Sequence, residues 1–254
     1  ILIFCGVLLT STLGCLISFQ LPIFLNELDK SDLTYYLKGI IYGILGLLPI
    51  LIVSGLMLQI EHFLISFLPV IFICMILIGL FFISFKTLIT VLTIFSKIVQ
   101  TLGYIFFFLL CLTFFFNKNF TNMTLIDEAL RIVFQMSIIV CGSLVFCEII
   151  LRNFSKQIEK AGKILQIDKY SVMGIILSFG TSIAMLPLFP KMNNKGKILN
   201  AAFSLSGAFV FGGQLGFIAS VNPQSVTWFI IVKITAGLLG IFIANIFEKQ
   251  SITQ

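Results

Sequence analysis

The stretch VMGIILSFGTSIAMLPLFP, residues 172–190, decides how this chain is organised. It is apolar and long enough to cross a hydrocarbon core of ~30 Å. However, Gly180-Thr181-Ser182 interrupts its middle, and Pro187 and Pro190 break its end. Such a segment either crosses a membrane or dips into it and returns to the face from which it entered.

The whole chain has the composition of a membrane protein. Of its 254 residues, 59% are hydrophobic and 10% are charged, whereas roughly a quarter of the residues in a soluble domain are charged. Besides 172–190, the apolar segments are 1–25, 35–60, 63–85, 98–116, 129–151, 198–221 and 226–247. We therefore predict one all-α transmembrane domain over 1–254, with about seven transmembrane helices and one re-entrant broken segment.

The basic residues favour the re-entrant interpretation of 172–190, because lysine and arginine accumulate in cytoplasmic loops. If the segment returns, thirteen of the 16 basic residues are cytoplasmic, Lys118 and Arg131 lie outside, and Lys233 lies within a span. If it crosses, only nine basic residues are cytoplasmic and six lie outside. Backbone that is not helical at membrane depth must line a cavity or be covered by protein, so the dip is typical of transporters and channels.

Two further segments are predicted to lie at the membrane surface. Residues 86–97, KTLITVLTIFSK, are too short to cross and carry a lysine at each end, which indicates an interfacial helix. Residues 152–171 are basic and amphipathic and form a cytoplasmic linker. The six cysteines lie in apolar stretches without zinc or disulfide spacing, so we expect no metal and no cofactor.

The stretch FVFGGQLGF, residues 209–217, interrupts a predicted span with three glycines and a glutamine. We expect the break at Gly212 and Gly213 to face the break at Thr181 and Ser182 as parts of one substrate site. A buried Gln214 needs partners for its donors and its acceptor, which a glycine packing interface alone does not supply. The alternative for the hydroxyls and glycines is helix packing.

Other polar residues in the spans are weaker candidates for the site. Asn200 and Ser204 share one helix face and either extend a polar path or bond neighbouring helices. Lys233 lies about two turns into the last span, where an ammonium group costs ~2.5–3.5 kcal/mol. Glu148 is a carboxylate near the cytoplasmic end of a span. Both charges could couple to the solute or serve the structure. No residues support an enzymatic function.

A family resemblance adds to this interpretation, and four sequences carry it. They are GKIL (162–165), KMNNKGKILNAAF (191–203), FGGQLGF (211–217) and IVKITAGLLG (231–240). Together they resemble the bacterial ethanolamine permeases, the EutH-type ethanolamine utilization transporters, most strongly over about 160–240. Members of that family are longer at the N-terminus, so the resemblance implies an N-terminally truncated chain and an inverted-repeat fold.

The chain also departs from the family pattern. The family has two asparagines and a proline at the positions of Thr181, Ser182 and Ala184. It has an acidic residue followed by a polar one where this chain has Gly213 and Gln214. Loss of a carboxylate weakens a site for a protonated amine. The resemblance therefore implies either a divergent paralogue with a different small polar solute or a decaying copy.

The resemblance implies transport of ethanolamine or a related small polar amine across the cytoplasmic (inner) membrane. The expected partners are the amine and the lipid bilayer, and no nucleic acid. The sequence does not decide whether the chain forms a homo-oligomer. Two alternatives also stay open, namely a non-transporting or degenerate membrane subunit and a channel-like facilitator for a neutral solute.

Overall fold

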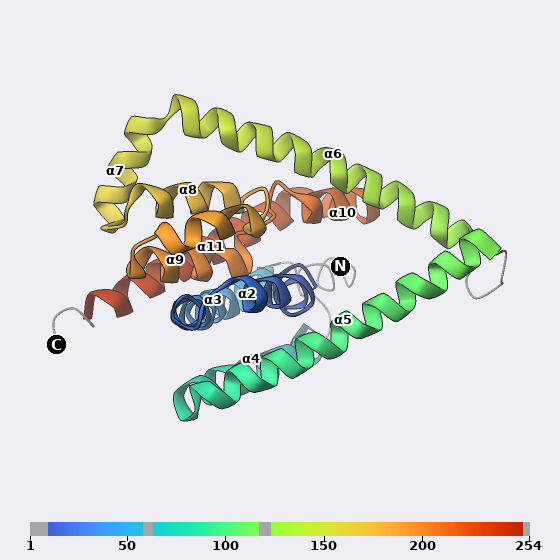
Figure 1. Cartoon of the computed structure of the whole chain (residues 1–254), viewed down its shortest axis with the longest axis horizontal. Coiled ribbons are helices and arrows are strands. Elements are labelled where there is room, and N and C mark those ends of the chain that lie inside the picture. The colour runs from blue at the N-terminus through green and yellow to red at the C-terminus, as the bar shows by residue number, and fades with distance from the viewer. Residues whose placement is uncertain (1–9, 58–62, 117–122, 251–254) are drawn as a thin grey trace.

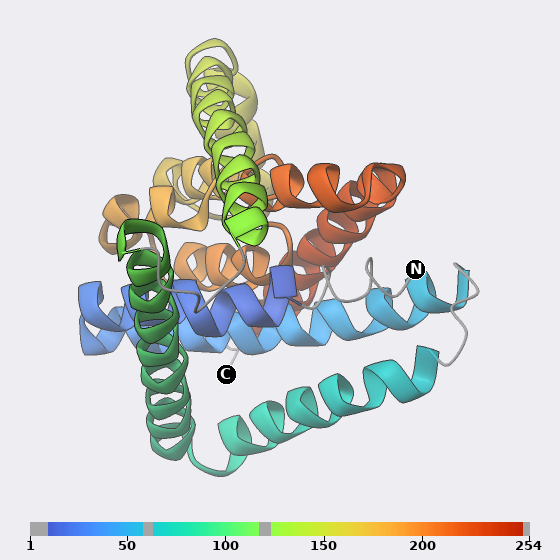
Figure 2. The ribbon, with the colours of Figure 1, turned by 90° about the vertical axis from the view of Figure 1, so that its right-hand side faces the viewer.

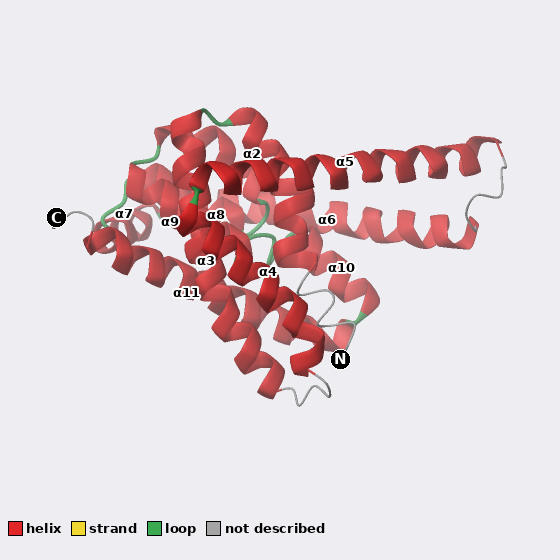
Figure 3. Cartoon of the chain, turned by 90° about the horizontal axis from the view of Figure 1, so that it is seen from below, coloured by secondary structure: helices red, strands yellow, loops and turns green. Residues whose placement is uncertain are grey.

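The computed structural model describes residues 10–57, 63–116 and 123–250, and its regular elements within these ranges are all helical (Figure 3). This agrees with the predicted all-α class. The N-terminal part holds the π-helical turns η1 (Thr10–Gly14) and η2 (Leu16–Gln20), then α2 (Leu21–Glu27) and α3 (Lys30–Met57). The middle holds α4 (Phe63–Ile83), α5 (Phe85–Phe116), α6 (Met123–Asn153) and α7 (Ser155–Leu165). The C-terminal part holds α8 (Lys169–Ser178), η3 (Ser182–Lys191), α9 (Asn194–Ser206), α10 (Gly213–Val221), η4 (Pro223–Ser225) and α11 (Val226–Gln250).

The centre of the molecule is the close packing of α3, α9 and α11 (Figure 1). Gly39, Gly43 and Gly46 form a strip along one face of α3. A Cβ atom on Gly43 would lie 2.7 Å from the Ala202 carbonyl oxygen of α9, and one on Gly46 would meet the backbone of Gly240 in α11. Side chains have no room there, so glycine lets the three backbones approach each other as in other membrane helix interfaces.

Charged residues gather at one end of this three-helix centre. Lys197 of α9 pairs with Asp32 of α3 at 2.5 Å, and both side chains are buried. Lys38 of α3 pairs with Glu248 of α11 at 2.7 Å. The N-termini of α3 and α9 and the C-terminus of α11 therefore lie at the same end of the molecule.

Helices α5 and α6 diverge as two long arms, with the three-helix centre between them (Figures 1 and 2). Most of their large apolar side chains are exposed, among them Phe106, Phe107, Phe134 and Phe146. Exposed apolar surface of this extent is expected where a helix faces lipid.

Four helices in the described residues are long and apolar enough to cross a membrane, namely Lys30–Ser54, Phe85–Phe116, Ile126–Asn153 and Pro223–Lys249. They coincide with four of the seven predicted spans. The predicted span 198–221 is not one helix, because α9 ends at Ser206 and α10 begins at Gly213. The predicted 63–85 is a single helix, of which Ile71–Ile83 is a shorter apolar segment. Part of 1–25 lies outside the described residues.

The predicted boundary between 86–97 and 98–116 is absent. Both belong to the continuous helix α5, since neither glycine nor proline occurs between Lys86 and Thr101 to interrupt it. The location of 86–97 at the membrane interface stays a prediction. So does the cytoplasmic location of 152–171, which contains the amphipathic helix α7.

Candidate functional site

The segment 172–190 is broken in the middle, at the position that the sequence indicated. Helix α8 ends at Ser178, and the chain continues after Thr181 as the 3₁₀ helix η3. Thr181 caps η3 with its hydroxyl oxygen, which accepts from the Ile183 amide at 3.4 Å. Pro187 and Pro190 have no amide hydrogen, and both lie inside η3. Two packed short helices thus replace one spanning helix.

The two ends of this broken segment are tied together. The Asp168 carboxylate caps α8 by accepting from the amide and hydroxyl of Ser171 at 2.9 and 3.0 Å. It also accepts from the Asn193 amide at 2.6 Å, and Asn193 in turn caps α9. Burial raises the pKa of Asp168, but these hydrogen bonds outweigh it and hold the pKa below its usual range. We call the Asp168–Ser171–Asn193 group the clasp. The residues just before and just after the broken segment therefore lie next to each other.

A second break separates α9 from α10. Residues 207–212 form turns, and Phe209 adopts a left-handed conformation with φ of 60°. This conformation is uncommon for a residue with a bulky side chain and marks a strained point in the backbone. The strain is located where the chain reverses its course between two short helices.

The two breaks meet through main-chain hydrogen bonds. The Phe209 amide donates to the Ser178 carbonyl and the Phe211 amide donates to the Phe179 carbonyl, both at 2.9 Å. Gly212 lies so close to the Gly180 carbonyl oxygen that a Cβ atom on Gly212 would overlap it. The expected proximity of the two breaks is thus observed, and it depends on backbone rather than on side chains.

A buried polar cluster lies next to the second break. The Lys233 ammonium of α11 donates to the Gln214 side-chain oxygen of α10 at 2.6 Å, and Lys233 is 1% exposed. Gln20 of η2 donates to the Ser204 carbonyl of α9 at 3.2 Å. The Tyr36 hydroxyl of α3 donates to the Gln20 side-chain oxygen at 3.3 Å. Polar groups from five elements therefore converge in an otherwise apolar interior.

Four buried side-chain polar atoms have no hydrogen-bond partner among the described residues. They are the hydroxyl oxygens of Ser182 and Ser206 and the side-chain oxygens of Asn200 and Asn245. An unsatisfied buried polar group costs about 1–3 kcal/mol, so each needs a reason to persist. Ser182 directly follows the first break, and Ser206 directly precedes the second.

The predicted site residues fall into two groups. The first group lies at or beside the breaks and comprises Thr181, Ser182, Gly212, Gly213 and Gln214.

The second group is held by hydrogen bonds and an ion pair. Lys233 donates to Gln214, and the Ser204 hydroxyl donates to the Ala201 carbonyl. Asn200 donates to the Ser171 and Gly196 carbonyls. Glu148 forms an exposed ion pair with Arg152.

Two participants were missed by sequence reasoning. Tyr36 lies in an apolar helix. The only sequence signal for its role is its hydroxyl group, since a buried tyrosine hydroxyl needs a hydrogen-bond partner. Asp168 precedes the apolar segment and could have been identified as a helix cap three residues before Ser171. Groups of three or more histidine, cysteine, aspartate or glutamate side chains able to hold a metal do not occur in the described ranges.

Comparison with known proteins places this architecture in a family. Residues 1–247 match the family described as EutH, the ethanolamine utilisation protein. The chain is 29% identical to the "Probable ethanolamine permease EutH" of Listeria monocytogenes over 98% of its own length and 69% of that relative. It is 26% identical to the uncharacterized protein YxeR of Bacillus subtilis and to the "Probable ethanolamine permease EutH" of Escherichia coli, covering 65% and 66% of them.

The chain thus spans about two thirds of the length of these relatives. No solved structure matches it significantly. The long apolar helices, the broken segments and the match over nearly all residues agree with each other. This chain belongs to the EutH family of ethanolamine utilisation proteins.

Proposed function

We propose that this chain carries the substrate path of a membrane permease for ethanolamine or a closely related small polar amine. The observation that supports this most is the contact between the two helix breaks, with a buried lysine and a half-buried glutamine beside it. Broken helices that meet in the interior are a recurrent way to build a solute site within a membrane. The names of the relatives supply the substrate class.

The surroundings of the breaks suit an ammonium group. Helices α8 and α9 both end there, at Ser178 and Ser206, and a helix C-terminus carries partial negative charge. The Phe179 ring lies 5.0 Å from the Phe203 ring and 5.8 Å from the Phe211 ring, which places three aromatic rings together at the first break. Aromatic faces attract ammonium groups by ~0.5–2 kcal/mol. We therefore assign the amine of the solute to the α8 side of the breaks.

The hydroxyl end of the solute then points to Gln214 and Lys233. An ammonium group beside Lys233 would be repelled by the lysine charge, whereas a hydroxyl oxygen accepts from it. At the first break, the Ser182 hydroxyl supplies a further partner for the solute, because it is buried and unsatisfied among the described residues. In this arrangement one site distinguishes the two ends of an amino alcohol without an acidic residue.

Within this proposal the chain has about seven transmembrane helices and dips into the cytoplasmic membrane at 172–190, as one part of an inverted-repeat transporter. The clasp supports the dip because it returns the chain to its starting point. The contact of Lys195 with Gln166 at 3.4 Å supports a common face for 152–171 and 191–197. Single cysteines at Gln166 and Lys191, which are both exposed positions, should react with an impermeant maleimide from the same side of sealed vesicles. A cysteine at Arg131 should react from the opposite side.

The decisive experiment measures uptake of radiolabelled ethanolamine by cells expressing the reading frame that encodes this chain, with choline and ethylene glycol as competitors. We expect saturable uptake blocked by unlabelled ethanolamine. Ser182→Ala should raise the half-saturating concentration about tenfold, the effect of one lost hydrogen bond of ~1.4 kcal/mol. The matched control Ser137→Ala, which removes an exposed hydroxyl on α6, should leave it unchanged.

Two results would contradict the proposal. A well-expressed, folded protein without uptake would support a non-transporting membrane subunit. Uptake that does not saturate and does not depend on the amine group of the solute would support a channel-like facilitator for neutral solutes.

A further inference from the structure

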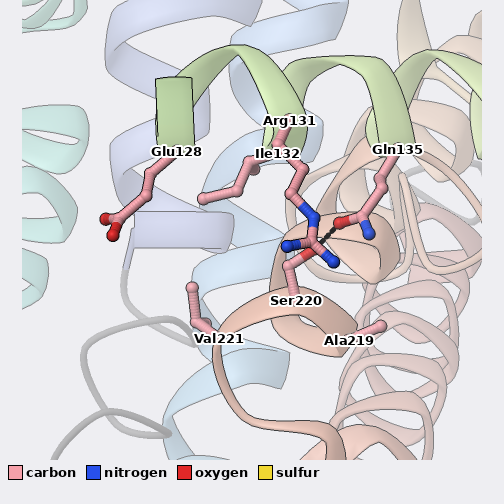
Figure 4. Close-up of a pocket in the computed structure, with 7 residues that line it drawn as sticks. All are labelled: Glu128, Arg131, Ile132, Gln135, Ala219, Ser220 and Val221. Atoms are coloured by element: carbon pink, nitrogen blue, oxygen red, sulfur yellow. Dashed lines mark hydrogen bonds between the residues drawn. The ribbon is translucent and has the colours of Figure 1, made fainter. Parts of the chain in front are cut away.

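A second polar site lies between α6 and α10. Glu128, Arg131 and Gln135 of α6 face Ser220 and Val221 of α10 around a cavity of about 430 Å³ (Figure 4). The Ser220 hydroxyl donates to the Gln135 side-chain oxygen and joins the two walls. This cavity is lined by none of the residues that form the helix breaks.

The cavity carries one acidic and one basic side chain on the same helix. Figure 4 shows the Glu128 carboxylate and the Arg131 guanidinium at opposite sides of the pocket. No ion pair joins them in the part of the chain that the structure describes. A simple cation would be attracted by Glu128 and repelled by Arg131, and a simple anion would experience the reverse. A zwitterion with an ammonium group and an anionic group at its two ends satisfies both.

Arg131 favours an anion that presents two oxygens side by side. Its planar guanidinium donates two parallel hydrogen bonds and suits a phosphate or a carboxylate. Glu128 accepts from an ammonium, and the amide nitrogen of Gln135 is a donor for a further phosphate oxygen. The pocket therefore offers partners for both ends of a phosphoethanolamine group.

The pocket continues into an apolar groove. A second cavity of about 260 Å³ shares Gln135 and Ser220 with the first and extends along α6 to Ile138, Ile139 and Gly216. A polar head pocket with an apolar continuation has the shape and chemistry of a site for an amphiphile.

The location of the pocket also fits a headgroup. It lies where α10 ends at Val221, before the polar residues 222–225, and close to the start of α6. Trp228, which is 40% exposed, follows shortly after. Tryptophan and charged side chains at the ends of apolar helices are typical of the membrane–water interface.

We propose that the pocket formed by Glu128, Arg131, Gln135 and Ser220 binds a zwitterionic phosphoethanolamine group, supplied either as a phospholipid headgroup or as the free molecule. This site is separate from the substrate path and does not depend on transport of any amine. Its binding can therefore be measured whether or not the protein transports ethanolamine.

The test is isothermal titration of the purified, detergent-solubilised protein with O-phosphoethanolamine. We expect saturable binding that weakens at least tenfold in Glu128→Gln and in Arg131→Gln. Asp127→Asn, which neutralises the neighbouring exposed carboxylate on α6, should bind like the wild type. Ethanolamine and inorganic phosphate should each bind at least tenfold more weakly than O-phosphoethanolamine. Thermal melting of each variant verifies that it is folded.

Competition identifies the source of the group. Displacement of O-phosphoethanolamine by short-chain phosphatidylethanolamine, and not by phosphatidylglycerol, assigns a lipid headgroup; failure of both lipids to displace it assigns the free molecule. The proposal is overturned if the folded protein binds none of these compounds. It is also overturned if ethanolamine binds as tightly as O-phosphoethanolamine and Arg131→Gln strengthens that binding, which would make the pocket a simple amine site.

Discussion

The contact between the breaks predicts a large effect from a single methyl group at Gly212. Its φ of −108° is accessible to any residue, so Gly212→Ala introduces no strain in the dihedral angles. The substitution is unfavourable only because of a steric clash, since the added Cβ would overlap the Gly180 carbonyl oxygen. That atom belongs to the backbone and cannot rotate away as a flexible side chain would.

The magnitude follows from the geometry. A carbon atom and a carbonyl oxygen need about 3.3 Å, so the two segments must separate by about 1 Å. Overpacking of this kind costs about 1–3 kcal/mol. The amides of Phe209 and Phe211 would also lose their 2.9 Å bonds to the first break, at about 1 kcal/mol each. The total is about 3–5 kcal/mol of destabilisation concentrated at the breaks.

The assay is uptake of radiolabelled ethanolamine per folded molecule, with the folded amount taken from fluorescence-detected size exclusion. Gly212→Ala should reduce uptake per folded molecule at least tenfold. Gly142→Ala on α6, where an added Cβ meets nothing within 4 Å, should change neither uptake nor stability. Gly43→Ala crowds the α3–α9 interface away from the breaks and should lower the melting temperature while each folded molecule still transports.

The comparison between Gly212→Ala and Gly43→Ala separates the site from general stability. Equal loss of uptake per folded molecule in both variants would show that tight packing anywhere controls transport. Normal uptake and melting in Gly212→Ala would mean that the breaks do not need their close contact, and the reasoning would fail.

Three further predictions concern the charged groups. Because hydrogen bonds depress the pKa of Asp168, its stabilisation is present above pH ~4 and is lost as the pH falls below that value. Wild-type melting temperatures should therefore fall between pH 5 and pH 3, whereas Asp168→Asn should start about 1–2 kcal/mol less stable and lose less on acidification. Lys197→Met should cost about 3–5 kcal/mol in thermal melts by leaving Asp32 buried without its ion pair, and Asp32→Leu in the same chain should restore most of it. Lys233→Met should reduce uptake at least tenfold, and adding Gln214→Leu should reduce it little further, since the two side chains act as one hydrogen-bonded unit.

The sequence predicts the breaks better than it predicts their surroundings. Gly180, Gly212 and Gly213 interrupt apolar segments by local chemistry, so a break after α8 and the start of α10 can be expected without knowledge of the fold. The end of α9 at Ser206, several residues before these glycines, was not expected. The contact between the breaks was predicted as well, but only as a proximity. The amides of Phe209 and Phe211 that create it carry no sequence signal.

Pairings between distant residues account for most of what was missed. Gln20 bonds the Ser204 carbonyl 184 residues away, and no local pattern specifies that bond. The Glu128–Arg131 pocket depends on α10 lying against α6, which follows from packing alone. The boundary expected at residue 97 was placed by lysine positions, whereas backbone continuity depends on the absence of a helix breaker.

The clasp also has a consequence for the order of assembly. Asp168 and Asn193 are 25 residues apart, whereas the Asp32–Lys197 pair closes a loop of 165 residues. Chain-closure entropy alone makes the shorter loop cheaper by about 2 kcal/mol. The unit of α8, η3 and the start of α9 is therefore expected to fold from its own neighbours in the chain, before α3 docks against it. In a stepwise inserted membrane protein, the first break would be shaped early, and the second would be fitted to it.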